Sequence, residues 1–272
     1  MKLCFRSSLI LYFSKKFHFM KFKCRLLNLF SVFLFCFGSL AAQETTVIVR
    51  ALAKDAKFIG NSIGGAKIII RNAETGEILD QGLTSGSTGD TKLILQTPQK
   101  RYDSLTDEKT AGFEAKLRID KPTFIDVEAH APINKKQAKV VSTTQLWVIP
   151  GKDITGDGVV LEVPGFVVDI LSPQTHERIN SSEEINLKAN VIMMCGCPVT
   201  EGGTWDANQY EVKAIIASEG IESREITLSP TEKPSTFAAN MNLEKGYYTI
   251  TIYAFDPVTG NTGVDKTNII IN

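Results

Sequence analysis

Four sulfur-bearing side chains lie within five positions of the second half of the chain, in the stretch NVIMMCGCPV. They are Met193, Met194, Cys195 and Cys197, with Gly196 between the two cysteines. Thiolate and thioether sulfurs are soft ligands that suit Cu(I), whereas paired cysteines in an oxidising compartment form disulfides. Three interpretations therefore stand: a disulfide with a structural or redox role, a soft-metal site, and plain packing at the end of a buried strand.

The residues around the cysteines indicate where the strand ends. Alternate residues of a strand share a face, so Met193 belongs to the apolar face of the strand expected over 184–193. Gly196 is typical of a bulge or bend, and Pro198 cannot donate to a sheet ladder. The strand is therefore expected to end near Cys195. A disulfide would need a kink, because fully extended Cα atoms two positions apart are about 6.5 Å from each other.

The stretch from Cys195 to Trp205 is expected to form a loop at the rim of a sandwich. Trp205 and Asp206 in this region are candidates for binding a partner, since tryptophan is enriched among the residues that dominate protein interfaces. A core tryptophan of the immunoglobulin type is the competing interpretation of Trp205. Trp147, in TTQLWVI, is predicted to be a core residue.

Two metal interpretations remain open. The candidate ligands for Cu(I) are Met193, Met194, Cys195, Cys197 and His176, the last from the loop after the first strand of the same domain. Separately, Asp153, Thr155 and Asp157 in DITGDG match the start of a calcium loop, but Pro164 stands where the loop needs a bidentate carboxylate. A glycine-rich turn is the favoured interpretation of DITGDG. No other cofactor is expected.

The N-terminal stretch is typical of a signal peptide. From Met20, the expected start, a basic head is followed by an apolar run and small residues up to Ala42, so we expect residues 1–42 to be cleaved on export. This segment holds seven of the 30 Lys and Arg residues, none of the 30 Asp and Glu residues, and three of the five cysteines. The remainder has a formal charge of about −7, which argues against nucleic acid as a partner.

Period-two alternation broken by turn residues runs through the rest of the chain and predicts an all-β fold. In the first half the expected strands cover 45–53, 66–72, 113–119, 124–131 and 142–149. In the second half they cover 166–171, 184–193, 210–217, 223–229, 235–243, 247–255 and 266–272. Residues 150–165 hold two prolines and four glycines and are predicted to be a linker or linker hairpin. The sequence thus predicts two β-sandwiches in series.

The two halves resemble known families. Residues 166–272, with SP after the first strand (Ser172, Pro173) and YYTITIYAFDPVTGNTG in the last hairpin, resemble bacterial immunoglobulin-like or cadherin-like domains. Residues 43–149, through GGAKIIIRNAETGEILDQGLTSGSTGDT, resemble the transthyretin-like regulatory domains of carboxypeptidases, from which the polar insertion 96–112 departs. Both resemblances imply sandwiches used for adhesion, spacing and docking.

The function expected from the sequence is that of an exported accessory protein, periplasmic or extracellular. It would act by binding a protein partner through the Cys195 to Trp205 loop, without catalysis and without insertion into the membrane after cleavage. The first alternative is a periplasmic protein that handles Cu(I). The second, and the only enzymatic one, is a thiol–disulfide exchange factor with Cys195 and Cys197 as its pair.

Overall fold

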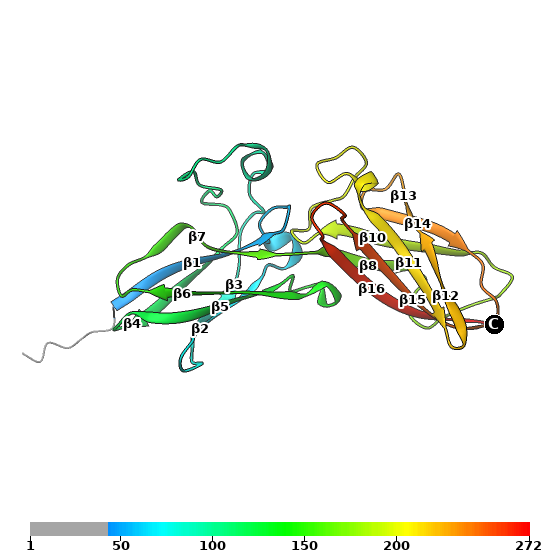
Figure 1. Ribbon diagram of the computed structural model, residues 1–272, viewed down its shortest axis with the longest axis horizontal. Helices are drawn as coiled ribbons and strands as arrows, with labels where there is room; N and C mark the ends of the chain where they lie inside the picture. The colour runs from blue at the N-terminus through cyan, green and yellow to red at the C-terminus, as the bar shows by residue number, and fades with distance from the viewer. Residues whose placement is uncertain (1–42) are drawn as a thin grey trace, which may run out of the picture. The chain divides into compact units, whose positions relative to one another are not determined.

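The computed structural model describes residues 43–272, and strands dominate this part of the chain (Figure 1). The expected signal peptide, residues 1–42, lies outside the described residues. The strands form four sheets that pair as two sandwiches. The prediction of an all-β fold built from β-sandwiches is confirmed.

The first sandwich combines a three-stranded sheet, in the order β4-β1-β7, with a four-stranded sheet, in the order β3-β2-β5-β6. The strands are β1 (Gln43–Ala53), β2 (Lys67–Asn72), β3 (Ile78–Leu83), β4 (Phe113–Ile119), β5 (Thr123–Ala131), β6 (Val140–Val148) and β7 (Ile154–Val163). Along β5 every second side chain is buried, from Thr123 to Ala131. This period follows from the alternation of side chains across a pleated strand, and it places one face of β5 in the core.

Residues 154–163 form strand β7 instead of the linker expected over 150–165. β7 runs parallel to β1, with Val49 opposite Val159 and Ala53 opposite Val163, and it completes the first sandwich. A side chain at Gly158 would lie 2.2 Å from the carbonyl oxygen of Ile48, so glycine here permits a close approach between two strands. Only Pro164 and Gly165 separate β7 from the next strand.

The second sandwich combines a sheet in the order β13-β14-β10-β8 with a sheet in the order β12-β11-β15-β16-β9. The strands are β8 (Phe166–Ser172), β9 (Glu177–Ile179), β10 (Ile185–Met193), β11 (Glu211–Ser218), β12 (Ile221–Thr227), β13 (Ser229–Pro230), β14 (Thr236–Met241), β15 (Gly246–Phe255) and β16 (Thr262–Ile271). All seven strands expected in this half are present, and the short strands β9 and β13 are additional.

Short helical turns interrupt the loops. They are η1 (Asn61–Ile63), η2 (Lys92–Gln96), η3 (Lys136–Ala138) and η4 (Ala207–Gln209). The polar insertion follows η2, and the buried guanidinium of Arg50 holds its far end by donating to the carbonyl oxygens of Thr110 and Ala111. Burial lowers the pKa of Arg50, and the nearby carboxylates of Asp157 and Asp107 act in the opposite direction.

Candidate functional site

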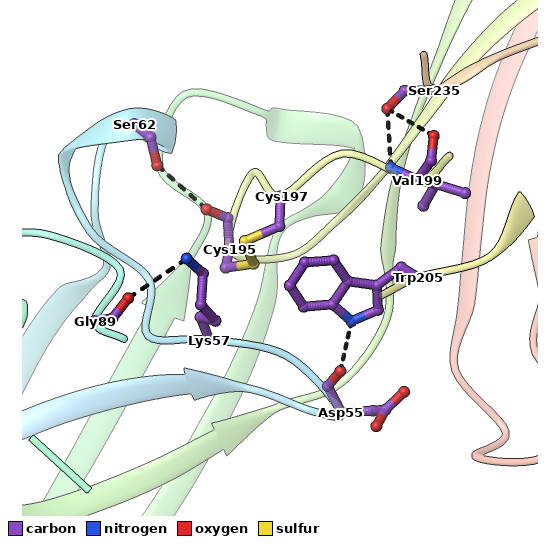
Figure 2. Close-up of a disulfide and its surroundings, with 9 residues drawn as sticks. All are labelled: Asp55, Lys57, Ser62, Gly89, Cys195, Cys197, Val199, Trp205 and Ser235. Atoms are coloured by element: carbon purple, nitrogen blue, oxygen red, sulfur yellow. Dashed lines mark hydrogen bonds between the residues drawn. A yellow bond between two sulfur atoms is a disulfide. The ribbon is translucent and has the colours of Figure 1, made fainter. Parts of the chain in front are cut away.

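The two cysteines lie in a tight turn directly after β10, where they are joined by a disulfide bond (Figure 2). Their Cα atoms are 5.4 Å apart. Gly196 between them has a φ of 80°, which favours glycine, and its N–H donates to the carbonyl oxygen of Met193 at 2.8 Å. The N–H of Met193 donates in turn to the carbonyl oxygen of Cys197 at 3.0 Å. The strand therefore turns back on itself at the kink that Gly196 provides.

This disulfide is covered. Cys195 is 0% exposed and Cys197 is 6% exposed. The hydroxyl of Ser62, in η1 of the first sandwich, donates to the carbonyl oxygen of Cys195 at 3.2 Å, as Figure 2 shows. Thiol–disulfide exchange requires a thiolate to reach one of the sulfurs, so the described arrangement gives the exchange hypothesis no support.

Trp205 is also buried, with 7% of its surface exposed. Its indole N–H donates to the carbonyl oxygen of Asp55 in the first sandwich, at 2.8 Å (Figure 2). The side chain expected as an exposed anchor for a partner thus makes its contact within the chain. Asp206 beside it accepts from the backbone N–H groups of Asn208 and Gly202, and these bonds lower the pKa of Asp206. Asp206 therefore caps η4 and orders the loop.

The candidate Cu(I) ligands are not all brought together. Met193 and Met194 are buried in the core next to the disulfide. The backbone N–H of His176 donates to the carbonyl oxygen of Asn268 in β16. Met193 is instead level with Gly263 of β16, because Met193 pairs with Phe166 and Phe166 lies beside Gly263. Asn268 and Gly263 are five residues apart. Five residues of strand span about 17 Å, so His176 is remote from the sulfurs. Within residues 43–272, no group of three or more His, Cys, Asp or Glu residues is placed to hold a metal ion.

A second set of bonds joins the sandwiches at the turn before β16. Asn261 is fully buried; its side-chain oxygen accepts from the N–H of Gly165 at 2.9 Å and its amide donates to the carbonyl oxygen of Lys54 at 3.1 Å. The ammonium of Lys54 donates to the carbonyl oxygen of Thr259 at 2.7 Å. Together with Trp205 and the disulfide turn, these contacts form what we call the junction. The cysteine loop belongs to the junction.

The candidate calcium ligands have other partners. Asp153 accepts from the N–H of Thr46 at 2.8 Å. Asp157 accepts from the N–H groups of Leu105 and Thr106, at 2.9 and 3.1 Å, and from the hydroxyls of Ser104 and Thr106. Burial acts to raise the pKa of Asp157, but these hydrogen bonds outweigh it and the pKa is lowered. Its carboxylate therefore fastens the polar insertion to β7, and Thr155 is exposed on the same strand.

Asp157→Ala is expected to loosen the insertion, because the hydrogen bonds to residues 104–106 are lost. Limited proteolysis should then cleave within residues 96–112 faster than in the unchanged protein. Since the folded pKa of Asp157 lies below its ordinary value of 3.8, the stabilisation by Asp157 is fully present above that ordinary value and is lost as the pH falls through the folded pKa. Equal cleavage rates for the variant and the unchanged protein at neutral pH would contradict this role.

An exposed sheet face remains on the first sandwich, on the outward side of β3-β2-β5-β6, and we call it the open face. In successive rows across the strands, its side chains are Trp147 and Phe124; Gln145, Asp126, Arg71 and Ile78; Thr143, Glu128, Ile69 and Gln81; Val141, His130, Lys67 and Leu83. Successive rows are about 6.7 Å apart, the rise of two strand residues. The face thus extends over about 20 Å along its strands.

Trp147 is 57% exposed on the open face, which corrects the prediction that it is a core residue. Its ring lies 5.1 Å from the ring of Phe124, centroid to centroid, with a tilt of 37°. The sequence contained the signal for this position. In TTQLWVI, Leu146 and Val148 are the inward pair, so period-two alternation puts Trp147 on the same side as polar Gln145.

The polar groups of the open face pair with one another. Glu128 lies between two partners, with Arg71 Nε 3.3 Å from Oε1 and His130 Nε2 2.9 Å from Oε2. The hydrogen bond with His130, followed by the pairing with Arg71, lowers the pKa of Glu128. The amide of Gln145 donates to Asp126. These contacts fix the orientations of the polar side chains beside the aromatic pair.

Comparisons with known proteins find similar chains among solved structures alone. No protein-family model matches the chain, and no curated protein matches it. Among solved structures, an engineered protein matches with a TM-score of 0.30 and 19% identity. The match covers 46% of this chain and 24% of the engineered protein. The fibronectin(III)-like modules of CbhA from Clostridium thermocellum match with a TM-score of 0.28 and 10% identity. This match covers 85% of this chain and 87% of theirs.

The titin domains Z1Z2, solved in complex with telethonin, give a TM-score of 0.24 with 9% identity over 85% of this chain and 89% of that one. At these TM-scores the likenesses support no inference, and the fold rests on its own strands. The transthyretin-like resemblance of the first half stays a prediction. Among the helices of residues 43–272, none has the length and apolar character needed to cross a membrane.

Proposed function

We propose that this chain is an exported, non-catalytic binding protein that holds its ligand on the open face of the first sandwich. The observation that carries the proposal is the position of Trp147, whose indole is more than half exposed on a regular sheet. Large aromatic side chains contribute strongly to binding when a partner covers them. The signal-peptide pattern of residues 1–42 supports export.

The junction gives this proposal a second support. The cysteine loop, expected from the sequence to bind the partner, is engaged with the first sandwich through Ser62 and Asp55. The buried residues of this loop, Cys195 and Trp205 among them, therefore make their contacts within the chain. A binding role is better served by Trp147, which has an exposed ring and a fixed neighbour in Phe124.

The test is co-sedimentation of the purified protein with cell-envelope material from the organism that produces it. We expect Trp147→Ala to abolish most of the sedimentation, while Tyr102→Ala leaves it unchanged. Tyr102 is a matched control because its ring is 85% exposed on the polar insertion, which is fastened to β7 of the other sheet. If the unchanged protein does not sediment, or if Trp147→Ala sediments equally well, the proposal is wrong.

A further inference from the structure

The open face combines an isolated aromatic platform with ordered polar rows. Its exposed apolar residues are not contiguous: Trp147 is at one end, Val141 and Leu83 are at the other, and Ile78 lies at an edge. The two rows between these ends expose mainly polar side chains, among them Asp126, Arg71 and Glu128, because the apolar Ile69 in the second of these rows is only 7% exposed. Protein–protein interfaces instead bury an apolar centre surrounded by a polar rim. The arrangement on the open face is the reverse, because its polar groups occupy the centre.

The charges of this face balance. Lys67 and Arg71 carry positive charges, Asp126 and Glu128 carry negative charges, and the formal sum is zero with His130 neutral. Arg71 and Glu128 are moreover paired with each other at 3.3 Å. A face with no net charge offers little long-range attraction to a polyanion or a polycation. Charge complementarity therefore favours a neutral ligand.

We propose that the open face binds a neutral polysaccharide, and this inference rests on the proposed binding function of the same face. A pyranose ring has one apolar face of C–H groups, which can pack against the exposed indole of Trp147. Its hydroxyl groups project from the ring edge and can both donate and accept hydrogen bonds. Along β5 the outward polar side chains of Asp126, Glu128 and His130 follow at intervals of about 6.7 Å, which suits an extended chain of sugars.

The neighbouring polar groups are suited to bonding hydroxyls. Asp126 and Gln145 are hydrogen-bonded to each other in the row next to the aromatic pair. Each retains further capacity, since a carboxylate accepts at both oxygens and an amide both donates and accepts. Because their orientations are already fixed, little side-chain entropy is lost when a ligand binds. We therefore expect this pair to bond the hydroxyls of the sugar stacked on Trp147.

Native gel electrophoresis through soluble polysaccharides tests the inference with defined probes. We expect the protein to be retarded in gels that contain at least one of hydroxyethylcellulose, galactomannan, mixed-linkage glucan or soluble starch. Alginate, a polyuronate, should not retard it beyond a gel without polymer. Trp147→Ala should weaken binding by at least about tenfold, and Gln145→Ala by several-fold.

Tyr247→Ala is the matched control, because Tyr247 is 76% exposed on the second sandwich and should bind as the unchanged protein does. A single cooperative unfolding transition in each variant, well above the temperature of the gel, shows that the fold is intact. The inference is overturned if none of the neutral polymers retards the protein, if alginate alone does, or if Trp147→Ala migrates like the unchanged protein. A third outcome separates the ligand class from the binding function. If neutral polymers do not retard the protein, but its co-sedimentation depends on Trp147 and is abolished by protease treatment of the envelope material, the polysaccharide is the wrong ligand and the binding function stands.

Discussion

Trp205→Ala is expected to lower the free energy of unfolding by about 3–5 kcal/mol, the usual cost of removing a large buried aromatic side chain. The indole is nearly fully buried at the junction, so the substitution leaves a cavity beside the disulfide turn. It also leaves the carbonyl oxygen of Asp55 without the bond that Trp205 donates. Urea denaturation followed by circular dichroism measures the change.

Trp147→Ala is the comparison variant for stability: because the ring is more than half exposed and packs on Phe124, the loss should be smaller, about 0.5–1.5 kcal/mol, the usual contribution of an aromatic pair. Trp205→Phe should fall between the two, since it keeps most of the packing but loses the donated hydrogen bond. Equal costs for Trp205→Ala and Trp147→Ala would show that the junction does not stabilise the fold. The two tryptophans are thus expected to separate stability from binding.

Asn261→Ala is expected to cost about 2–4 kcal/mol, because it leaves one buried and one partly buried backbone group without partners; a fully buried group costs about 1–3 kcal/mol and the partly buried one less. The groups are the N–H of Gly165 and the carbonyl oxygen of Lys54. Asn186→Ala, at an exposed asparagine of β10, should cost less than about 0.5 kcal/mol. Both variants can be measured in urea as for Trp205. A cost for Asn261→Ala no larger than that for Asn186→Ala would contradict the bridging role.

Much of the fold follows from local patterns. Strand β4 occupies Phe113–Ile119, the range that alternation indicates, and the seven expected strands of the second half are all present. The pattern succeeds there because one face of each strand is buried and the other is solvated, so apolar and polar residues alternate along the sequence. Glycine, proline, asparagine and aspartate residues, which favour turns, then indicate where most of these strands end.

Strand β7 shows where local patterns fail. Its segment contains Gly156 and Gly158, and glycine-rich stretches between prolines are typical of turns. Gly158 is instead required by the close approach of Ile48 in β1, a contact between residues remote in sequence. The alternation of Val159, Leu161 and Val163 is a local sign of a strand, but it does not indicate the parallel pairing with β1. Burial of Trp205 was one of its two interpretations from the sequence, but the junction could not be predicted, because the contact of Trp205 with Asp55 joins residues remote in sequence.

The parallel pairing of β1 with β7 also has a consequence for how the chain can be divided and in what order it folds. β1 is the first strand of the described chain, and the strand that covers its second edge is the last of the same sandwich. A fragment ending at residue 149 would leave that edge of β1 unpaired, and unpaired edges are sites of aggregation. During synthesis β1 must therefore wait for residues 154–163, a long-range step that slows folding and lengthens the period in which a chaperone is useful.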